Sequence, residues 1–273
     1  MLSKKISYQG KNVIVTGAAS GLGRCLSIHF SKKGANLILI DKNGPLLKQV
    51  CFEINNLKGN VDSHVIDLSE LEVLPDNIDT ILMGYDRIDV LVNCAGIEVD
   101  GFVDDTPIEG FRENYDVNLY APLLLSQKVI PLMKKAGRGQ IVNVSSDMAK
   151  RSIPGRSAYC MTKSALSALT ETLRLELAPY NIDAVLVFPS VLDTPFRKNI
   201  KYYGRITKQT FNDVRKRNNP SIVASYIIRD LEKRKLIIKK LSFVKCFLLL
   251  NHIFPFIADF IIRKTMKPEE MNL

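Results

Sequence analysis

A glycine-rich turn directly after the first apolar segment constrains this chain more than any other feature. Residues 11–17 are predicted as a strand that runs into Gly17-x-x-x-Gly21-x-Gly23, and a helix is expected over about residues 22–33. Glycine lets the backbone turn sharply and approach a pyrophosphate, whose charge rests at a helix N-terminus. The spacing is a variant of the dinucleotide fingerprint G-x-G-x-x-G. The alternative is an ordinary strand-to-helix turn, which three glycines in seven residues disfavour.

Apolar segments of strand length alternate with longer helical segments along most of the 273 residues. The short segments are rich in Val, Ile and Leu without polar alternation, which suits a parallel sheet buried on both faces. The pattern predicts an α/β fold: a Rossmann-type doubly wound parallel sheet of six or seven strands in a single domain, with a ligand crevice at the carboxyl ends of the strands. Further strands are expected at residues 36–40, 61–65, 88–92, 140–144, 182–188 and 236–238, and further helices at 46–57, 158–177 and 220–234.

Asp41 ends the predicted second strand, 18 residues after Gly23. A carboxylate at this position can accept hydrogen bonds from both ribose hydroxyls, which favours NAD over NADP. A helix cap or a turn aspartate is the alternative interpretation. Arg24 and Lys42 lie close by in the sequence and could meet a 2′-phosphate, so NADP stays open as the cofactor.

Tyr159 and Lys163 stand at i and i+4 in the predicted long helix, so their side chains share a face. An ammonium ~4 Å from a phenol at an effective dielectric of ~20 stabilises the phenolate by ~4 kcal/mol, or about three pKa units. Such a phenol can act as general acid and base. Ser146, or alternatively Ser145, ends the fifth predicted strand and could donate a hydrogen bond to a substrate carbonyl. Taken alone, this tyrosine–lysine spacing is more often a chance surface pair.

The chain resembles the short-chain dehydrogenase/reductase family in its Tyr-x-x-x-Lys form. The resemblance extends over about residues 8–240, and its motifs occur in family order. They are Thr16-Gly17-x-x-x-Gly21-x-Gly23, Asp67-Leu68, Asn93-Cys94-Ala95-Gly96, Asn118, Ser146, Tyr159-x-x-x-Lys163 and Pro189…Thr194. Cys94 stands where the family commonly has Asn or Ala, and Ser190 stands where it commonly has Gly. Neither departure removes a catalytic group.

The resemblance implies four catalytic residues. Tyr159 would be the acid/base, and Lys163 would lower the phenol pKa and bind the nicotinamide ribose. Ser146 would orient the carbonyl, and Asn118 would hold a water in a proton relay through Lys163. A non-catalytic nucleotide-binding relative is the alternative, but such a protein would be free to lose one of these four groups.

The resemblance also implies a nicotinamide cofactor site. Asp67 would contact adenine, Asn93 would hold the central strands near the cofactor, and Thr194 would approach the carboxamide. The expected cofactor-binding residues are Gly17, Ser20, Gly21, Leu22, Gly23, Asp41, Asp67, Leu68, Asn93, Ala95, Gly96, Tyr159, Lys163, Pro189 and Thr194.

The net charge of +10 is concentrated in the last quarter of the chain. Residues 197–273 carry 18 Lys and Arg against six Asp and Glu, net +12, whereas residues 1–196 are net −2. The apolar run over 241–262 is interrupted by charged and polar residues, which suits an amphipathic segment at a bilayer surface better than a membrane span. A helix that packs on the core or covers a subunit contact is an equal alternative. We therefore expect an oxidoreductase domain over 1–240, a helical extension over 241–273, and peripheral membrane contact through 241–264.

Composition excludes several other classes. The five cysteines and three histidines are scattered, which predicts neither a disulfide framework nor a metal site and suits a reducing, cytoplasmic compartment. The first eleven residues contain no apolar secretory segment. Nucleic-acid binding is not expected, because no recognition motif accompanies the charge.

These observations predict an NAD(P)-dependent oxidoreductase that transfers a hydride between nicotinamide and a secondary alcohol or carbonyl. The apolar C-terminal segment favours a lipid-like substrate at a membrane surface. A 3-oxoacyl thioester reductase is the alternative enzyme. The family resemblance further implies a homo-oligomer.

Overall fold

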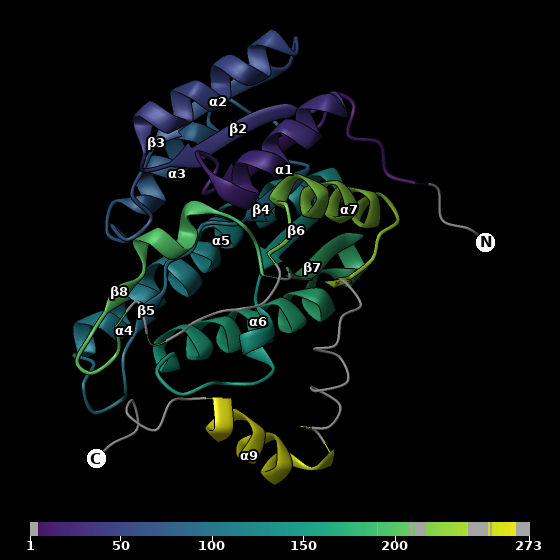
Figure 1. Ribbon diagram of the computed structural model, residues 1–273. Helices are drawn as coiled ribbons and strands as arrows, with labels where there is room; N and C mark the ends of the chain where they lie inside the picture. The colour runs from purple at the N-terminus through teal and green to yellow at the C-terminus, as the bar shows by residue number, and fades with distance from the viewer. Residues whose placement is uncertain are drawn as a thin grey trace.

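The computed structural model describes residues 5–189, 191–207, 210, 217–239, 251 and 253–265. Its centre is a seven-stranded parallel sheet with the strand order β3-β2-β1-β4-β6-β7-β9 (Figure 1). The predicted doubly wound Rossmann-type sheet is thereby confirmed. The strands are β1 (Asn12–Thr16), β2 (Asn36–Asp41), β3 (Asn60–Val65), β4 (Val90–Asn93), β6 (Gly139–Val144), β7 (Ile182–Phe188) and β9 (Ile237–Lys239).

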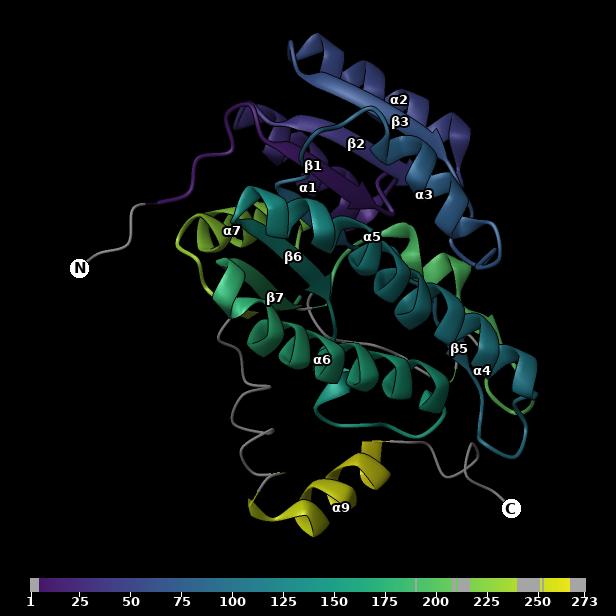
Figure 2. The ribbon, with the colours of Figure 1, turned by 180° about the vertical axis from the view of Figure 1, so that it is seen from behind.

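Helices cover both faces of this sheet (Figures 1 and 2). One face packs against α1 (Gly21–Lys32), α2 (Gly44–Asn56) and α7 (Pro220–Glu232). The other face packs against α3 (Leu74–Leu82), α5 (Ala121–Ala136) and α6 (Ser157–Leu177). Because successive strand side chains point to opposite faces, Val13 and Val15 of β1 join the first layer and Ile14 joins the second. The absence of polar alternation in the sequence reflects this burial on both sides.

The strands and helices predicted between residues 11 and 238 are present, with ends that differ from the structure by at most two residues, but helices α3 and α5 were not predicted. A small second sheet was not predicted. It pairs β5 (Val99–Asp100) with β8 (Lys201–Tyr202), and each strand is too short to show a periodic pattern. This pairing joins segments a hundred residues apart and lies beside α4 (Ile108–Tyr115) and the short helix η4 (Pro195–Asn199).

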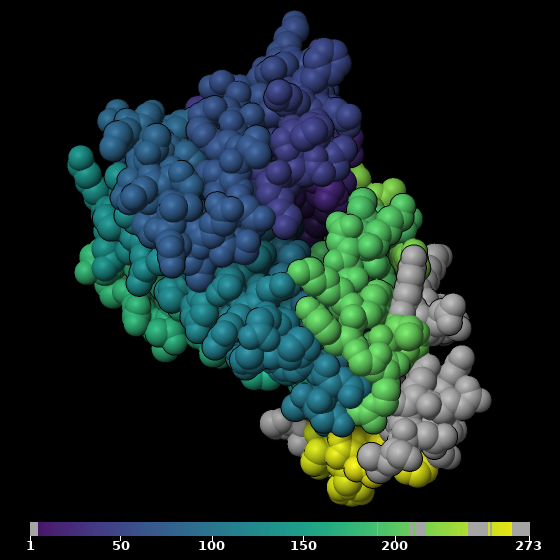
Figure 3. Space-filling view, turned by 90° about the vertical axis from the view of Figure 1, so that its left-hand side faces the viewer, coloured from purple at the N-terminus to yellow at the C-terminus, as the bar shows by residue number. Residues whose placement is uncertain are grey.

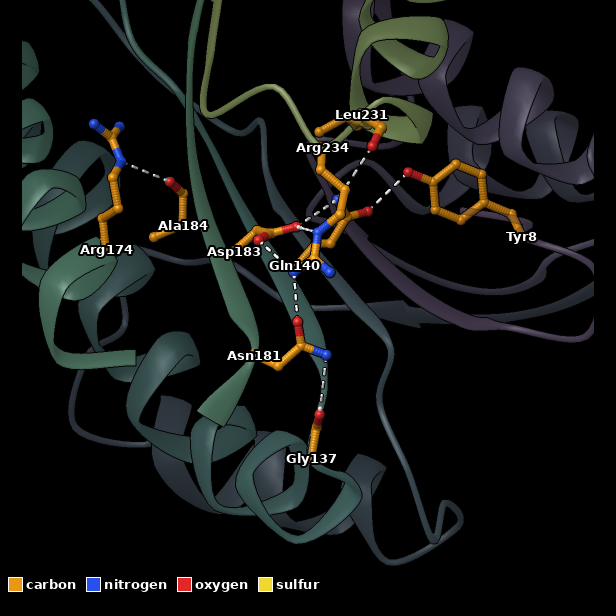
Figure 4. Close-up of polar contacts among 9 residues, drawn as sticks. All are labelled: Tyr8, Gly137, Gln140, Arg174, Asn181, Asp183, Ala184, Leu231 and Arg234. Atoms are coloured by element: carbon orange, nitrogen blue, oxygen red, sulfur yellow. Dashed lines mark hydrogen bonds and ion pairs between the residues drawn. The ribbon is translucent and has the colours of Figure 1, made fainter. Parts of the chain in front are cut away.

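A polar network closes the end of the sheet remote from the ligand crevice (Figure 4). Tyr8 donates its hydroxyl to Gln140 Oε1 at 2.8 Å, and Gln140 Nε2 reaches the Leu231 carbonyl at 3.4 Å. Arg234 forms a bidentate ion pair with Asp183, in which Nε donates at 3.0 Å and Nη2 donates at 2.8 Å. These contacts tie the N-terminal segment, β6, β7 and the α7–β9 turn together, so the last strand is held in register at the edge.

The C-terminal helix α9 (Pro255–Thr265) lies beyond α6, at the opposite end of the molecule from α2 in both ribbon views. Ala258 and Ile262 are buried, and Arg151 pairs with Asp259 and donates to Asn251 Oδ1 at 2.7 Å. The rest of the expected extension over 241–273 lies outside the described residues. Within the described ranges, no helix combines the length and apolarity needed to cross a bilayer.

Candidate active site

A cavity of about 890 Å³ opens at the carboxyl ends of the central strands. The expected site residues line this cavity, except for Asn93 and Asn118, which lie behind its wall. The sequence prediction of a crevice at this edge therefore agrees with the structure. The lining residues that were expected are Gly17, Ser20, Gly21, Leu22, Gly23, Asp41, Asp67, Leu68, Ala95, Gly96, Ser146, Tyr159, Lys163, Pro189 and Thr194.

The glycine-rich turn packs too closely for side chains. Gly17 has φ +66°, and a Cβ there would lie 2.8 Å from Ala95 Cα. A Cβ on Gly23 would lie 2.1 Å from the Gly17 carbonyl oxygen. Helix α1 begins at Gly21, and within the described chain its first turn has no acidic residue and no side-chain cap. The backbone amides of this first turn and the helix dipole fit a pyrophosphate at this position.

The turn after β4 is held against β1 by side-chain hydrogen bonds. Thr16 Oγ1 accepts from the backbone amides of Cys94 and Ala95, both at 3.1 Å. Asn93 Nδ2 donates to Asn143 Oδ1 at 2.8 Å, which links β4 to β6 inside the sheet. Asn93 therefore stands where it can hold the central strands, as the resemblance implies, but does not itself face the cavity. Burial raises the pKa of the Cys94 thiol to about 12, so this cysteine fits its site as a small neutral group.

Asp41 lies at the other end of the cavity, at the end of β2. Its Oδ2 accepts from the Ala19 amide at 2.9 Å and its Oδ1 from the Asn43 amide at 2.9 Å. The cap of α2 is Asn43, which accepts from Leu46, so Asp41 is a turn residue but not the cap. The two nearby cations have carboxylate partners: Arg24 pairs with Glu53, and Lys42 pairs with Asp67.

Asp67 follows β3 and faces the same end of the cavity. Its Oδ2 lies 3.3 Å from Lys42 Nζ, and its Oδ1 accepts from the Ser69 amide at 3.0 Å and hydroxyl at 2.8 Å. These hydrogen bonds and the ammonium outweigh partial burial, so the pKa of Asp67 is lowered. The carboxylate is held in one orientation next to Leu68.

Ser146 and Tyr159 meet at the centre of the cavity. The Ser146 hydroxyl hydrogen-bonds the phenol, and it also accepts from the Met148 amide at 3.2 Å. Ser145, the alternative, turns away: its hydroxyl contacts Ser167 Oγ at 3.0 Å and the Lys163 carbonyl at 3.2 Å. The geometry therefore favours Ser146 over Ser145 as the group beside the phenol.

Lys163 and Asn118 meet around Gly96. A Cβ on Gly96 would lie 3.1 Å from Asn118 Oδ1 and 3.6 Å from Lys163 Nζ, so a side chain there would press on Asn118. Asn118 sits in a π-helical turn, η1 (Asp116–Tyr120), and binds both the amide and the carbonyl of Ile97 at 2.9 Å. Lys163 Nζ donates to the Val144 carbonyl at 2.9 Å. The π turn interrupts α4 and α5 and aims Asn118 inward, as such turns often do at functional sites.

Burial controls the electrostatics of the two central groups. It raises the pKa of Tyr159 well above its ordinary value, the Glu98 carboxylate raises that pKa further, and the Ser146 hydrogen bond lowers it. Burial lowers the pKa of Lys163 to about 8, against an opposite effect of Cys94 and Glu98. The expectation that Lys163 brings the phenol toward neutral pH is not met in this structure. Lys163 Nζ stands 5.7 Å from the ring centroid, and burial is the largest effect on the phenol pKa.

Sequence reasoning missed several residues of the cavity wall. Phe196 stacks edge-on to Tyr159, with ring centroids 6.2 Å apart. Glu98 and Arg156 are buried side chains of the wall, and their ion pair joins the segment after Gly96 to the start of α6. Their positions beside family motifs, Glu98 after Gly96 and Arg156 before Tyr159, were a possible signal, but only the fold brings the two together.

The comparisons with known proteins identify one family. A family model described as short chain dehydrogenase matches residues 11–202. A dehydrogenase/reductase SDR family member 7B from Xenopus laevis is 33% identical over 238 residues, covering 83% of this chain and 72% of that protein. The 3-oxoacyl-[acyl-carrier-protein] reductase FabG of Thermotoga maritima is 32% identical, covering 81% and 89%. The 3-ketodihydrosphingosine reductase of Bos taurus is 29% identical, covering 83% and 70%.

Solved structures agree with this relationship. A short-chain dehydrogenase from Streptomyces avermitilis superimposes with a TM-score of 0.81 at 26% identity, covering 94% of this chain and 97% of that one. A metagenomic short-chain oxidoreductase in complex with NADP gives 0.72 at 26% identity, covering 87% and 98%. The 3-ketoacyl-(acyl-carrier-protein) reductase from Brucella melitensis complexed with NADH gives 0.70 at 26% identity, covering 81% and 90%.

The depressed pKa of Lys163 predicts a pH-dependent stability difference. The unfolded chain binds this proton more tightly than the folded chain, so a charged Lys163 lowers stability below about pH 8. Replacing it, in Lys163→Met, should therefore raise the free energy of unfolding relative to the parent most at neutral pH. This gain in the free energy of unfolding of Lys163→Met should shrink by about 3 kcal/mol as the pH rises toward the lysine pKa of the unfolded chain, ~10.4. Denaturant unfolding of both proteins across this range measures it. A difference that stays constant or grows with pH would contradict the burial argument.

Proposed function

Because the chain belongs to the short-chain dehydrogenase family and is thus an NAD(P)-dependent oxidoreductase, we propose that it transfers a hydride between nicotinamide and a secondary alcohol or carbonyl of a lipid-like substrate. The observation that carries the proposal is the meeting of Ser146, Tyr159 and Lys163 inside one cavity with the glycine-rich turn. The bound cofactor would supply or accept the hydride. The chain's own residues supply binding, orientation and the proton.

Each of the four groups has a distinct part in the proposed reaction. Tyr159 donates its hydroxyl proton to the carbonyl oxygen in reduction and accepts the alcohol proton in oxidation. Ser146 donates a hydrogen bond to the same oxygen as charge builds on it. Lys163 places a positive charge in the buried site and would bind the nicotinamide ribose. Asn118 holds the backbone of Ile97 and, through it, the shape of the turn around Gly96.

The cofactor assigned to this site is NAD. Asp41 faces the cavity with its carboxylate fixed by two backbone amides, where it can accept from ribose hydroxyls. Arg24 and Lys42, which could bind a 2′-phosphate, are paired with Glu53 and Asp67. These pairings support NAD over NADP, while the solved relatives include complexes with NADP and with NADH.

Two observations support a lipid-like substrate. Relatives include a 3-ketodihydrosphingosine reductase, and apolar residues, among them Phe196, Leu192 and Met148, line the cavity that holds Tyr159. A 3-oxoacyl thioester is the second candidate substrate. The FabG relatives favour it, and so do Arg197 and Lys201, which line the cavity and could meet phosphate groups.

The C-terminal helix is assigned to a membrane surface. Six large apolar side chains of this region are exposed: Ile253, Phe254, Phe256, Ile257, Phe260 and Ile261. An exposed apolar face of this kind with exposed basic neighbours, such as Arg263, suits the boundary of an anionic bilayer. The remainder of 241–264 falls outside the described residues.

The expected homo-oligomer stays a prediction. Met161 and Leu175 are exposed on α6, the helix that carries Tyr159, and they offer an apolar surface for a second copy. The cytoplasmic location likewise stays a prediction.

Tyr159→Phe tests the chemistry. It should lower kcat by about 10²–10⁴-fold and leave cofactor binding nearly unchanged, because the hydroxyl acts in the transition state. Turnover of long-chain ketones and 3-oxoacyl thioesters with both reduced cofactors measures it and separates the two substrate classes. Tyr180→Phe, a half-exposed tyrosine outside the cavity, is the control and should keep full activity. Retention of more than about a tenth of the activity in Tyr159→Phe would remove Tyr159 from this role.

Asp41→Ala tests the cofactor assignment. Loss of a charged acceptor should weaken NADH binding by about tenfold or more. The difference in affinity between NADH and NADPH should therefore become smaller. Calorimetric titration with each cofactor measures this, and a thermal melt confirms that the Ala19 turn has survived. A clear preference of the parent protein for NADPH would overturn the assignment.

Paired substitution of Ile253→Asp and Phe256→Asp tests the membrane surface. Sedimentation with phosphatidylserine vesicles should show that the parent binds them and that this binding weakens as salt is added. The affinity of the variant for the vesicles should be lower by at least about tenfold. Phe52→Asp, at an equally exposed site on α2, should bind as the parent does. If the parent stays free of vesicles at low salt, α9 does not meet a membrane.

A further inference from the structure

Helix α9 turns its larger apolar face away from the protein. The exposed apolar side chains of this helix are Phe256, Ile257, Phe260 and Ile261. They form pairs four residues apart, so they share one side of the helix. Ala258 and Ile262 are buried on the opposite side. A surface helix ordinarily packs its apolar stripe against the core, so the reversed orientation of α9 needs a cause.

A polar contact on the inner side of α9 fixes this orientation. Arg151 forms an ion pair with Asp259 through Nη2 and donates from Nη1 to Asn251 Oδ1 at 2.7 Å. Asp259 stands three residues before the buried Ile262, so it belongs to the inner side of the helix. Hydrogen bonds between charged partners are stronger than those between neutral groups. Turning the apolar face inward would carry Asp259 away from Arg151 and break their contact.

Arg151 lies in the connection between β6 and α6 that also carries Ser146. The connection contains the short helix η2 (Asp147–Ala149), and the Arg151 amide donates to the Asp147 carbonyl at 3.3 Å. The described lining of the cavity includes Ser146, Asp147 and Met148 but not Arg151. Arg151 therefore joins α9 to a segment of the cavity wall without belonging to the reacting groups.

We propose that Arg151 is a positioning residue that holds the apolar face of α9 outward, so that α9 rests on an anionic lipid surface beside the cavity wall and a lipid-borne substrate enters the cavity from that surface. This rests on the proposed function. When the surface contact and the cavity are held at a fixed relative position, the second binding step becomes intramolecular and the effective substrate concentration rises.

The charge of this part of the chain identifies the partner of the apolar face. Residues 197–273 have a net charge of +12, and Arg263 is exposed on α9 itself. Such a charge attracts an anionic bilayer. It disfavours a second copy of the same chain at this face, because like charges placed opposite each other repel.

Two substitutions that change the net charge in opposite directions test the contact. Arg151→Met removes a positive charge and Asp259→Ala removes a negative charge, and each should weaken binding to phosphatidylserine vesicles by about tenfold. Electrostatic attraction alone would make Asp259→Ala bind more tightly. The double variant should bind no more weakly than either single variant, because both substitutions break the same contact. Sedimentation with the vesicles measures all three.

Lys128 and Asp79 provide the matched control. They form an ion pair between α5 and α3, on the far side of α6 from α9 in both ribbon views (Figures 1 and 2). The exposed fractions of its side chains, 29% and 47%, resemble the 20% and 52% of Arg151 and Asp259. Lys128→Met and Asp79→Ala should each change the vesicle affinity by less than about twofold.

Three results of the vesicle experiment would overturn the role of Arg151. They are unchanged or tighter binding of Asp259→Ala, losses that add up in the double variant, and a parent protein that binds no vesicles. In the last case the oligomeric state identifies the other partner. A parent dimer that becomes a monomer when Ile253→Asp and Phe256→Asp are combined would assign the apolar face to a second copy.

Turnover of two ketones measures the catalytic consequence. For a long-chain ketone embedded in the vesicles, kcat/KM of Arg151→Met and Asp259→Ala should fall about tenfold, mainly through a higher KM. For a short water-soluble ketone, kcat/KM should equal that of the parent. An equal loss with both ketones would show damage to the site and overturn the positioning role. If the parent reduces neither ketone, the proposed function is wrong, and vesicle binding still decides whether Arg151 orients α9.

Discussion

The close approach of two backbone turns at the carboxyl edge of the sheet is the constraint on which the site depends. Gly17 and Ala95 come together so tightly that a Cβ on Gly17 would lie 2.8 Å from Ala95 Cα. Thr16 fixes that contact by accepting two amides of the turn after β4. The contact lies between β1 and β4, where the strand order reverses, which is where doubly wound sheets form ligand sites. The cavity (Figure 3, beside the light-green η4–β8 segment) follows from that topology.

Much of this architecture could be predicted because it is encoded locally. Buried strands such as β7 carry a continuous apolar run, and the turn after β1 needs glycine for steric reasons that any sequence must obey. The β5–β8 pairing could not be predicted, because its two strands are two residues long and their partners are a hundred residues apart. The choice of Ser146 over Ser145 also needed the fold, since only the folded chain shows which hydroxyl turns toward the phenol.

The predicted lowering of the Tyr159 pKa disagrees with the structure, whereas the prediction that steric fit requires glycine in the turn after β1 agrees with it. The difference has a physical cause. Spacing along a helix sets which side chains share a face, but not how much water surrounds them. Tyr159 and Lys163 do share a face, yet burial moves the two pKa values in the directions that disfavour both charged forms. The sign of the effect on the phenol depends on desolvation and on Glu98, a residue with no place in the Tyr-x-x-x-Lys pattern. Because burial disfavours the phenolate, the resting state of this site is the neutral phenol.

Isotope transfer tests the central claim most directly, because it reports on the reacting atoms. The protein is incubated with a long-chain ketone or a 3-oxoacyl thioester and with cofactor that carries deuterium at the transferable C4 position, and the alcohol product is analysed by mass spectrometry. The account predicts one deuterium on the carbinol carbon, with the accompanying hydroxyl proton drawn from solvent. Alcohol that forms without deuterium, or a cofactor that binds in the cavity and is never oxidised by any carbonyl of these classes, would contradict it.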